Sequence, residues 1–205
     1  MPSSSSDRPA GRKPRPPQLI ASGRILIRFV SNADRWGHAV EIDAVECLED
    51  SVRPNAPQAD PTLSVPKVIR WESVEGPGDD GDDPRWPASP VMTEIHRMGA
   101  GISSPLVGIG LAGRSHFSAS ITPDPDRPGA IRVDVATRLH EPPRWLGSTY
   151  RCLAIPRDLK LVRIVPAIPL PAQLPCTVQW SYRLSLDGIE PLAGTRLEEA
   201  GDRRG

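Results

Sequence analysis

Three residues whose side chains cooperate in hydrolases lie close together in the chain: His116, Ser118 and Asp134. A hydrolase triad needs the imidazole hydrogen-bonded to the serine, a carboxylate on the imidazole, and an oxyanion hole. The sequence lacks the Gly-x-Ser-x-Gly turn that strains and exposes a nucleophilic serine. We therefore rank hydrolysis third among the possible functions. Whether the chain is an enzyme stays open, with a non-enzymatic role favoured.

The same residues also suit ligand binding. Alternation predicts that Ser120 and Arg132 share a sheet face with them, above a floor of small residues such as Gly108 and Gly110. A ligand can approach backbone closely on such a floor, and polar groups can orient it. The favoured alternative is that another sheet, a loop or a second subunit packs there, so whether this face is buried or a site stays open.

A second candidate binding segment spans residues 142–151. It contains Arg144, Trp145 and Arg151, and Trp and Arg are enriched at interaction hot spots. An exposed Trp145 between two arginines would stack on a sugar or grip a peptide. The commoner arrangement is a tryptophan that plugs the end of a β-sandwich.

No metal or cofactor site is predicted. None of the four histidines has a partner two to four residues away, and residues 75–84 lack the alternating acidic spacing of a calcium loop. His38 is expected to be a hydrogen-bonded core residue. The three cysteines, Cys47, Cys152 and Cys176, form no CxxC pair, and we expect free thiols in a cytoplasmic protein.

Composition excludes several classes of partner. The 205 residues carry 25 basic and 25 acidic side chains, so no net field favours nucleic acid. No apolar run is long enough to span a membrane. The 25 prolines and 17 glycines favour short strands joined by turns.

Residues 105–139 give the clearest strand pattern. We expect a three-residue turn at 113–115, with a two-residue turn rejected because it sets Leu111 against His116. The chosen register gathers one apolar face, made of Val107, Ile109, Leu111, Phe117, Ala119, Ile121, Ile131, Val133 and Val135. Ser118 then points to the opposite face.

Alternation and turn residues predict further strands at 24–30, 35–47, 67–74, 91–98, 146–155, 159–165 and 177–186. The first two pair around a four-residue turn at 31–34, which sets Val30 opposite Arg35 and puts Ile27, Phe29 and His38 on one face. Residues 48–66 are expected to be a loop.

These patterns predict a mostly β protein: an antiparallel β-sandwich or flattened barrel of about eight or nine strands with disordered termini. The expected organisation is a disordered arm over 1–22, a single β domain over 23–192 and a disordered tail over 193–205. A binding or protein-interaction module, partnered by another protein or a second copy, is favoured. A β-sandwich that binds a small ligand or carbohydrate is the alternative.

Overall fold

The computed structural model describes residues 15–32, 34–43, 67–76, 85–153, 161–168 and 173–199. Over these ranges the chain forms thirteen β-strands and no helix. All neighbouring strands are antiparallel, and they form two sheets. The six strands expected within 105–186 and the two strands of the first hairpin are all found. Short additional strands at the sheet margins raise the number above the eight or nine predicted.

The larger sheet has seven strands in the spatial order β1-β2-β3-β4-β9-β10-β13. Their bounds are Gln18–Ser22 for β1, Ile25–Asn32 for β2, Arg35–Asp43 for β3, Lys67–Ser73 for β4, Ser148–Cys152 for β9, Leu161–Pro166 for β10 and Thr195–Glu199 for β13.

The smaller sheet has six strands in the spatial order β12-β11-β8-β7-β6-β5. Their bounds are Glu94–Arg97 for β5, Leu106–Ala112 for β6, Ser115–Pro123 for β7, Ile131–Leu139 for β8, Cys176–Ser185 for β11 and Gly188–Pro191 for β12.

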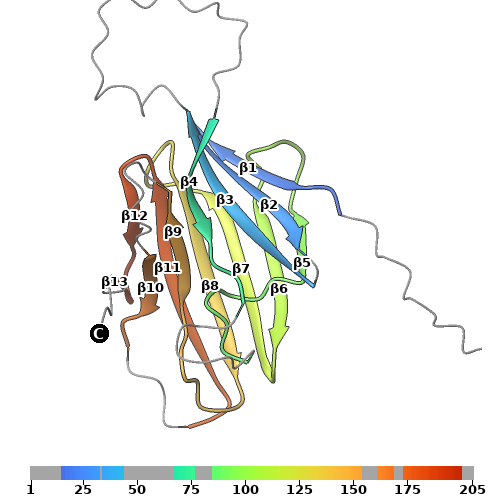
Figure 1. The fold of residues 1–205 in the computed structure, drawn as a ribbon, viewed down its shortest axis with the longest axis vertical. Helices are drawn as coiled ribbons and strands as arrows, with labels where there is room; N and C mark the ends of the chain where they lie inside the picture. The colour runs from blue at the N-terminus through green and yellow to red at the C-terminus, as the bar shows by residue number, and fades with distance from the viewer. Residues whose placement is uncertain are drawn as a thin grey trace, which may run out of the picture.

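The two sheets lie face to face, and in Figure 1 β2 and β3 cross in front of β6 and β7. They do not close into a barrel, so the sandwich is confirmed over the flattened barrel. Alternation builds the core: β7 and β8 turn Phe117, Ile121 and Val133 inward, where each is at most 5 % exposed. Burying such a side chain contributes about 1.5–3 kcal/mol.

The turn between β6 and β7 corrects the predicted register. Ala112 pairs with Ser115 and Leu111 pairs with His116, so the turn has two residues and not three. Gly113 opens it at φ +56°, the left-handed backbone that tight hairpin turns require and that glycine adopts without strain. The prediction was wrong because it weighed the apolar pattern above the turn chemistry.

The observed register exchanges the inward- and outward-facing residues of β6 relative to the prediction. Ile109 and Leu111 point to solvent, and Gly108 and Gly110 point into the sandwich. The reason lies in the segment before β5: a Cβ on Gly110 would stand 2.1 Å from the carbonyl oxygen of Val91. That segment fills the core space over β6, so β6 needs glycine on its inner face.

The β2–β3 hairpin also differs from its predicted register. Pairing sets Val30 opposite Gly37 and continues to Asn32 opposite Arg35, two residues from the expected alignment. A shift of two preserves side-chain direction, so the predicted shared face of Phe29 and His38 is correct.

Each of the two tails that were expected to be disordered contains a strand. Gln18–Ser22 forms β1, with Ile20 fully buried, and Thr195–Glu199 forms β13 on the edge beside β10. Both are short edge strands whose pairing with a neighbour compensates for weak alternation. Residues 1–14, 44–66 and 200–205 lie outside the described residues, and so do the predictions made for them.

Within the described ranges, no helix is long and apolar enough to cross a membrane.

Candidate functional site

Five of the eight predicted ligand-binding residues share the outer face of the six-stranded sheet. They are His116, Ser118, Ser120, Arg132 and Asp134, on β7 and β8. The residues that alternate with them, such as Phe117, are buried. This face points away from the core between the two sheets.

Cross-strand pairing arranges the face in rows across β6, β7, β8 and β11. The upper row is Leu111, His116, Arg138 and Thr177; the middle row is Ile109, Ser118, Ala136 and Gln179; the lower row is Val107, Ser120, Asp134 and Ser181. We call these twelve residues the meander face. Arg132 lies just beyond the lower row.

The rows separate the predicted catalytic groups. His116 and Asp134 are two rows apart, about 14 Å along the strands, because each row advances two residues. Asp134 instead accepts hydrogen bonds from the Ser181 hydroxyl at 2.6 Å and from Arg132 Nε at 3.0 Å. His116 stacks edge-on near His140, with ring centroids 6.1 Å apart. Shared direction on a sheet is thus not enough to assemble a triad.

The meander face is hollowed between its strands. Two shallow depressions of about 510 and 480 Å³ both touch Ser118 and Ala136, so they join into one trough across the middle row. The trough exists because Ser118 and Ala136 are small compared with His116 and Arg138 in the upper row.

An apolar ridge runs along β6 beside the trough. Leu111 is 51 % exposed and Ile109 is 42 % exposed, and Val107 continues the ridge as a partly buried residue. They are alternate residues of one strand, so their side chains form a continuous line. The meander face therefore has an exposed apolar ridge beside a shallow trough.

The other three predicted ligand-binding residues lie elsewhere. Arg151 is on β9 in the seven-stranded sheet and pairs with Glu72 at 3.5 Å. Trp145 is half-buried, and its six-membered ring covers Gly147 so closely that a Cβ there would come within 2.9 Å. Arg144 beside it is exposed. These residues are not brought together with the meander face.

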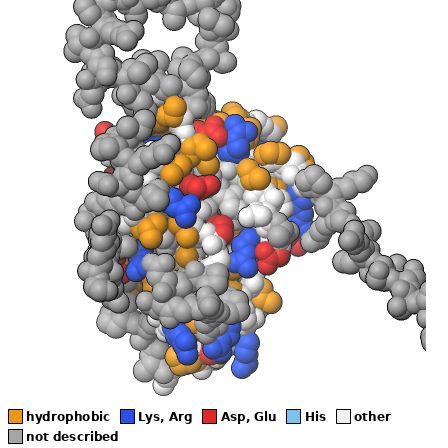
Figure 2. Space-filling view, in the orientation of Figure 1, with side chains coloured by type: hydrophobic (Ala, Val, Ile, Leu, Met, Phe, Trp, Pro, Cys, Tyr) orange, Lys and Arg blue, Asp and Glu red, His pale blue; other side chains and the backbone are white. Residues whose placement is uncertain are grey.

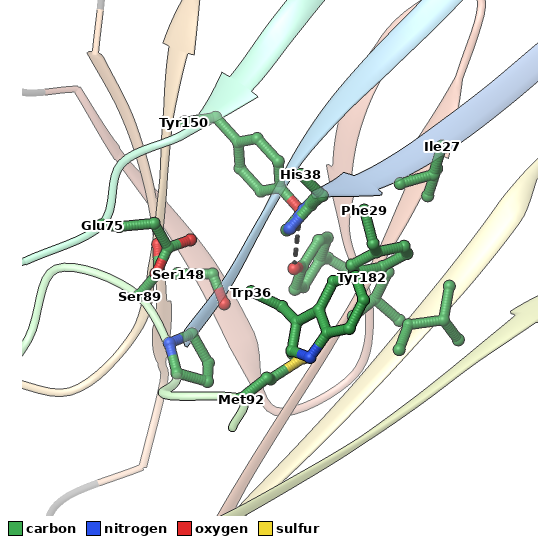
Figure 3. A pocket seen from close by; sticks show the side chains of 13 residues that line it. Ile27, Phe29, Trp36, His38, Glu75, Ser89, Met92, Ser148, Tyr150 and Tyr182 are labelled. Atoms are coloured by element: carbon green, nitrogen blue, oxygen red, sulfur yellow. Dashed lines mark hydrogen bonds between the residues drawn. The ribbon is translucent and has the colours of Figure 1, made fainter. Parts of the chain in front are cut away.

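A buried polar cluster lies in the core, and sequence reasoning found only its histidine. The Tyr150 hydroxyl hydrogen-bonds His38 Nε2 at 2.7 Å and the Tyr182 hydroxyl at 2.9 Å. Trp180 Nε1 donates to Ser148 Oγ at 3.0 Å. Figure 3 shows His38, Tyr150 and Tyr182, which come from both sheets, around a cavity of about 10 Å³, room for about one water. The expectation of a hydrogen-bonded core histidine is confirmed.

Glu75 is the acidic residue of this cluster. Ser73 Oγ donates to its Oε1 at 2.8 Å, whereas Oε2 is buried and has no hydrogen-bond partner in the described part of the chain. Burial raises the pKa of Glu75 from 4.5 to about 7, against the opposing effects of Ser73 and Arg35. Burial also lowers the pKa of His38 from 6.5 to about 4. No sequence pattern marks Glu75, which begins the acidic stretch 75–84.

The outer face of the seven-stranded sheet carries a different surface. A hollow of about 650 Å³ lies there, crossed by ion pairs such as Arg28–Glu41 at 2.6 Å. Its exposed apolar residues, Val30 and Ile69, lie on different strands that do not pair with each other. Figure 2 shows hydrophobic side chains separated by charged ones on this side of the molecule.

The described residues contain no group of three or more His, Cys, Asp or Glu arranged to hold a metal ion. Cys152 and Cys176 are free and partly buried, as expected, and Cys47 lies outside the described residues.

Searches against family models, curated proteins and solved structures find no match to this chain. Its function is therefore argued from the surface itself.

Proposed function

We propose that this chain is a non-enzymatic protein-interaction module that binds its partner through the meander face. The observation that carries the proposal is the exposed ridge of Ile109 and Leu111 beside the small-residue trough. Exposing two large aliphatic side chains on one strand to water is unfavourable, and a partner surface that covers them stabilises the complex.

The surrounding residues fit the anatomy of an interface. Arginine, aspartate, threonine and glutamine occupy the β8 and β11 side of the face, where they form a polar margin around the apolar ridge. By contrast, Val30 and Ile69 on the opposite sheet stand as separate residues among ion pairs, and single exposed apolar residues are ordinary on protein surfaces.

The alternatives have weaker support. Sugar-binding faces rely on exposed aromatic rings, but all nine aromatic residues lie in the described part of the chain, and each is buried apart from the half-buried Trp145. The hydrolase hypothesis needs His116 beside Asp134, and the register holds them two rows apart.

Site-specific photo-crosslinking tests the proposal. A benzophenone amino acid replaces Leu111 in the full chain, expressed in the cells that naturally make it, and a matched probe replaces Val30, which is 48 % exposed on the opposite sheet. We expect a light-dependent protein adduct at position 111 and not at position 30. The adduct is expected to disappear when Ile109→Lys is added. Equal adducts at both positions, or none at 111, contradict the proposal.

A further inference from the structure

We infer that the partner on the meander face is a second copy of this chain, packed face to face about a twofold axis along the middle row. The inference rests on the proposed function, because it names the occupant of the same surface. It follows from the row arrangement of the face, which a rotation about that row maps onto itself with complementary groups in contact.

The apolar ridge is the first complementary feature. A twofold axis along the middle row exchanges the upper and lower rows, so Leu111 meets Val107 of the partner subunit, and Ile109 meets Ile109 of the partner subunit. The apolar ridge of one copy thus packs against the ridge of the other, which removes the two exposed large apolar side chains of the face, Leu111 and Ile109, from water.

Charge is the second complementary feature. The same rotation sets Arg138 in the upper row opposite Asp134 of the partner subunit in the lower row, and symmetry makes this contact twice. Arg138 is exposed and donates to the Thr177 hydroxyl at 3.2 Å, so its guanidinium keeps further donors. Asp134 is 37 % exposed on its side chain and can accept another hydrogen bond beside those from Arg132 and Ser181.

Small residues on the axis permit the approach. Ser118 and Ala136 form the trough in the middle row, where the two sheets would come closest. Sheets that stack face to face lie about 10 Å apart. Ser118 and Ala136 leave space at the centre of this contact, beside the Ile109 side chains that meet at the β6 end of the same row.

Together with the flanking strands β5 and β12, the meander face is large enough for such a dimer. The six strands, about 4.8 Å apart and with about seven residues each at ~3.4 Å, present roughly 700 Å² per copy. A standard protein interface buries about 800 Å² per partner. The expected dimer is thus at the modest end of specific association, so its formation should depend on concentration.

Sedimentation of the purified full chain over a wide concentration range tests the inference, with Arg138→Glu and Asp134→Arg as separate variants. The wild type is expected to form a dimer. Each variant brings like charges together twice, so its self-association should weaken at least about tenfold. An equimolar mixture of the two variants should form a heterodimer, because both charge contacts are attractive there.

A control variant and a folding check distinguish a loss of dimerisation from a loss of folding. Arg151→Glu, on the opposite sheet, is the control that should dimerise like the wild type, and circular dichroism of every variant checks folding. A dimer in either single variant as strong as in the wild type, or a mixture that stays monomeric, overturns the inferred axis. If the wild type is monomeric at all concentrations, self-association is wrong, whereas crosslinking of position 111 to a different protein would still support the proposed function.

Discussion

At the scale of single residues, Glu75 and His38 line one cavity and respond to pH in opposite directions. The folded-state pKa of Glu75 is raised from 4.5 to about 7, so its contribution favours folding below about pH 4.5 and is lost as pH rises through 7. The folded-state pKa of His38 is lowered from 6.5 to about 4, so its contribution favours folding above pH 6.5 and is lost as pH falls through 4. Between about pH 4 and pH 7, the effects of Glu75 and His38 on folding stability therefore oppose each other.

Replacing Glu75 by glutamine should remove its contribution to the pH dependence of stability and leave that of His38. Relative to wild type, Glu75→Gln is expected to lose about 1–3 kcal/mol of stability when the pH is lowered from 7.5 to 4.5, because only the wild type gains a tightly held proton. Denaturant unfolding at several pH values measures this difference. Glu72→Gln, an exposed residue paired with Arg151, is the control and should show a smaller change. Parallel pH curves for Glu75→Gln and wild type would show that Glu75 is ionised normally.

At the scale of elements, β6 is held by the segment that crosses its inner face. Thr93 donates its backbone N–H to the carbonyl of Ile109 at 2.8 Å, and Trp36 donates its backbone N–H to the carbonyl of Met92 at 2.8 Å. The segment therefore connects β3 in one sheet with β6 in the other. Its backbone occupies the space where side chains of β6 would normally stand, which explains why Ile109 and Leu111 of β6 point outward onto the meander face.

A pair of glycine substitutions tests this arrangement. Gly110→Ala should cost more than about 3 kcal/mol, because the new Cβ meets the backbone oxygen of Val91 at 2.1 Å and backbone cannot move aside cheaply. Gly108→Ala is the matched control, since its Cβ meets the flexible thioether end of Met92 at 2.5 Å. Chemical denaturation should rank Gly110→Ala as the more damaging. Equal, small effects would place β6 in the register with Ile109 inside.

At the scale of the whole molecule, β1 joins the two sheets. It pairs with β2 in the seven-stranded sheet, and Ala21 donates its backbone N–H to the carbonyl of Ile102, between β5 and β6, at 3.1 Å. Arg97 of β5 donates to the carbonyl of Leu19. Ile20, between these contacts, is fully buried. The segment expected to be a dispensable arm thus includes a structural strand.

Ile20→Ala should destabilise the protein by about 2–5 kcal/mol, the usual cost of emptying a core position. Leu197→Ala is the control on the other edge strand, β13, where Leu197 is 41 % exposed and the expected cost is under about 1 kcal/mol. Thermal or denaturant unfolding of both variants gives the comparison. If the two changes cost the same, β1 does not contribute to the core, and deletion of residues 1–22 would be tolerated.

Several parts of the fold and of the site could be predicted from residues alone. The directions of Phe117, Ser118 and Asp134 were correct because side-chain direction alternates with a period of two along β7 and β8. The direction of Leu111 was wrong because the β6–β7 register differs by one. An error of one residue reverses a face, and an error of two preserves it.

The class of fold and most strand positions follow from the residues alone, since alternating apolar residues and dense Pro and Gly act locally along the chain. The buried face of β6, the entry of Glu75 into the core and the packing of Trp145 over Gly147 arise only from tertiary packing. These outcomes depend on segments distant in sequence competing for the same space, and packing of that kind leaves no periodic mark in the residues involved.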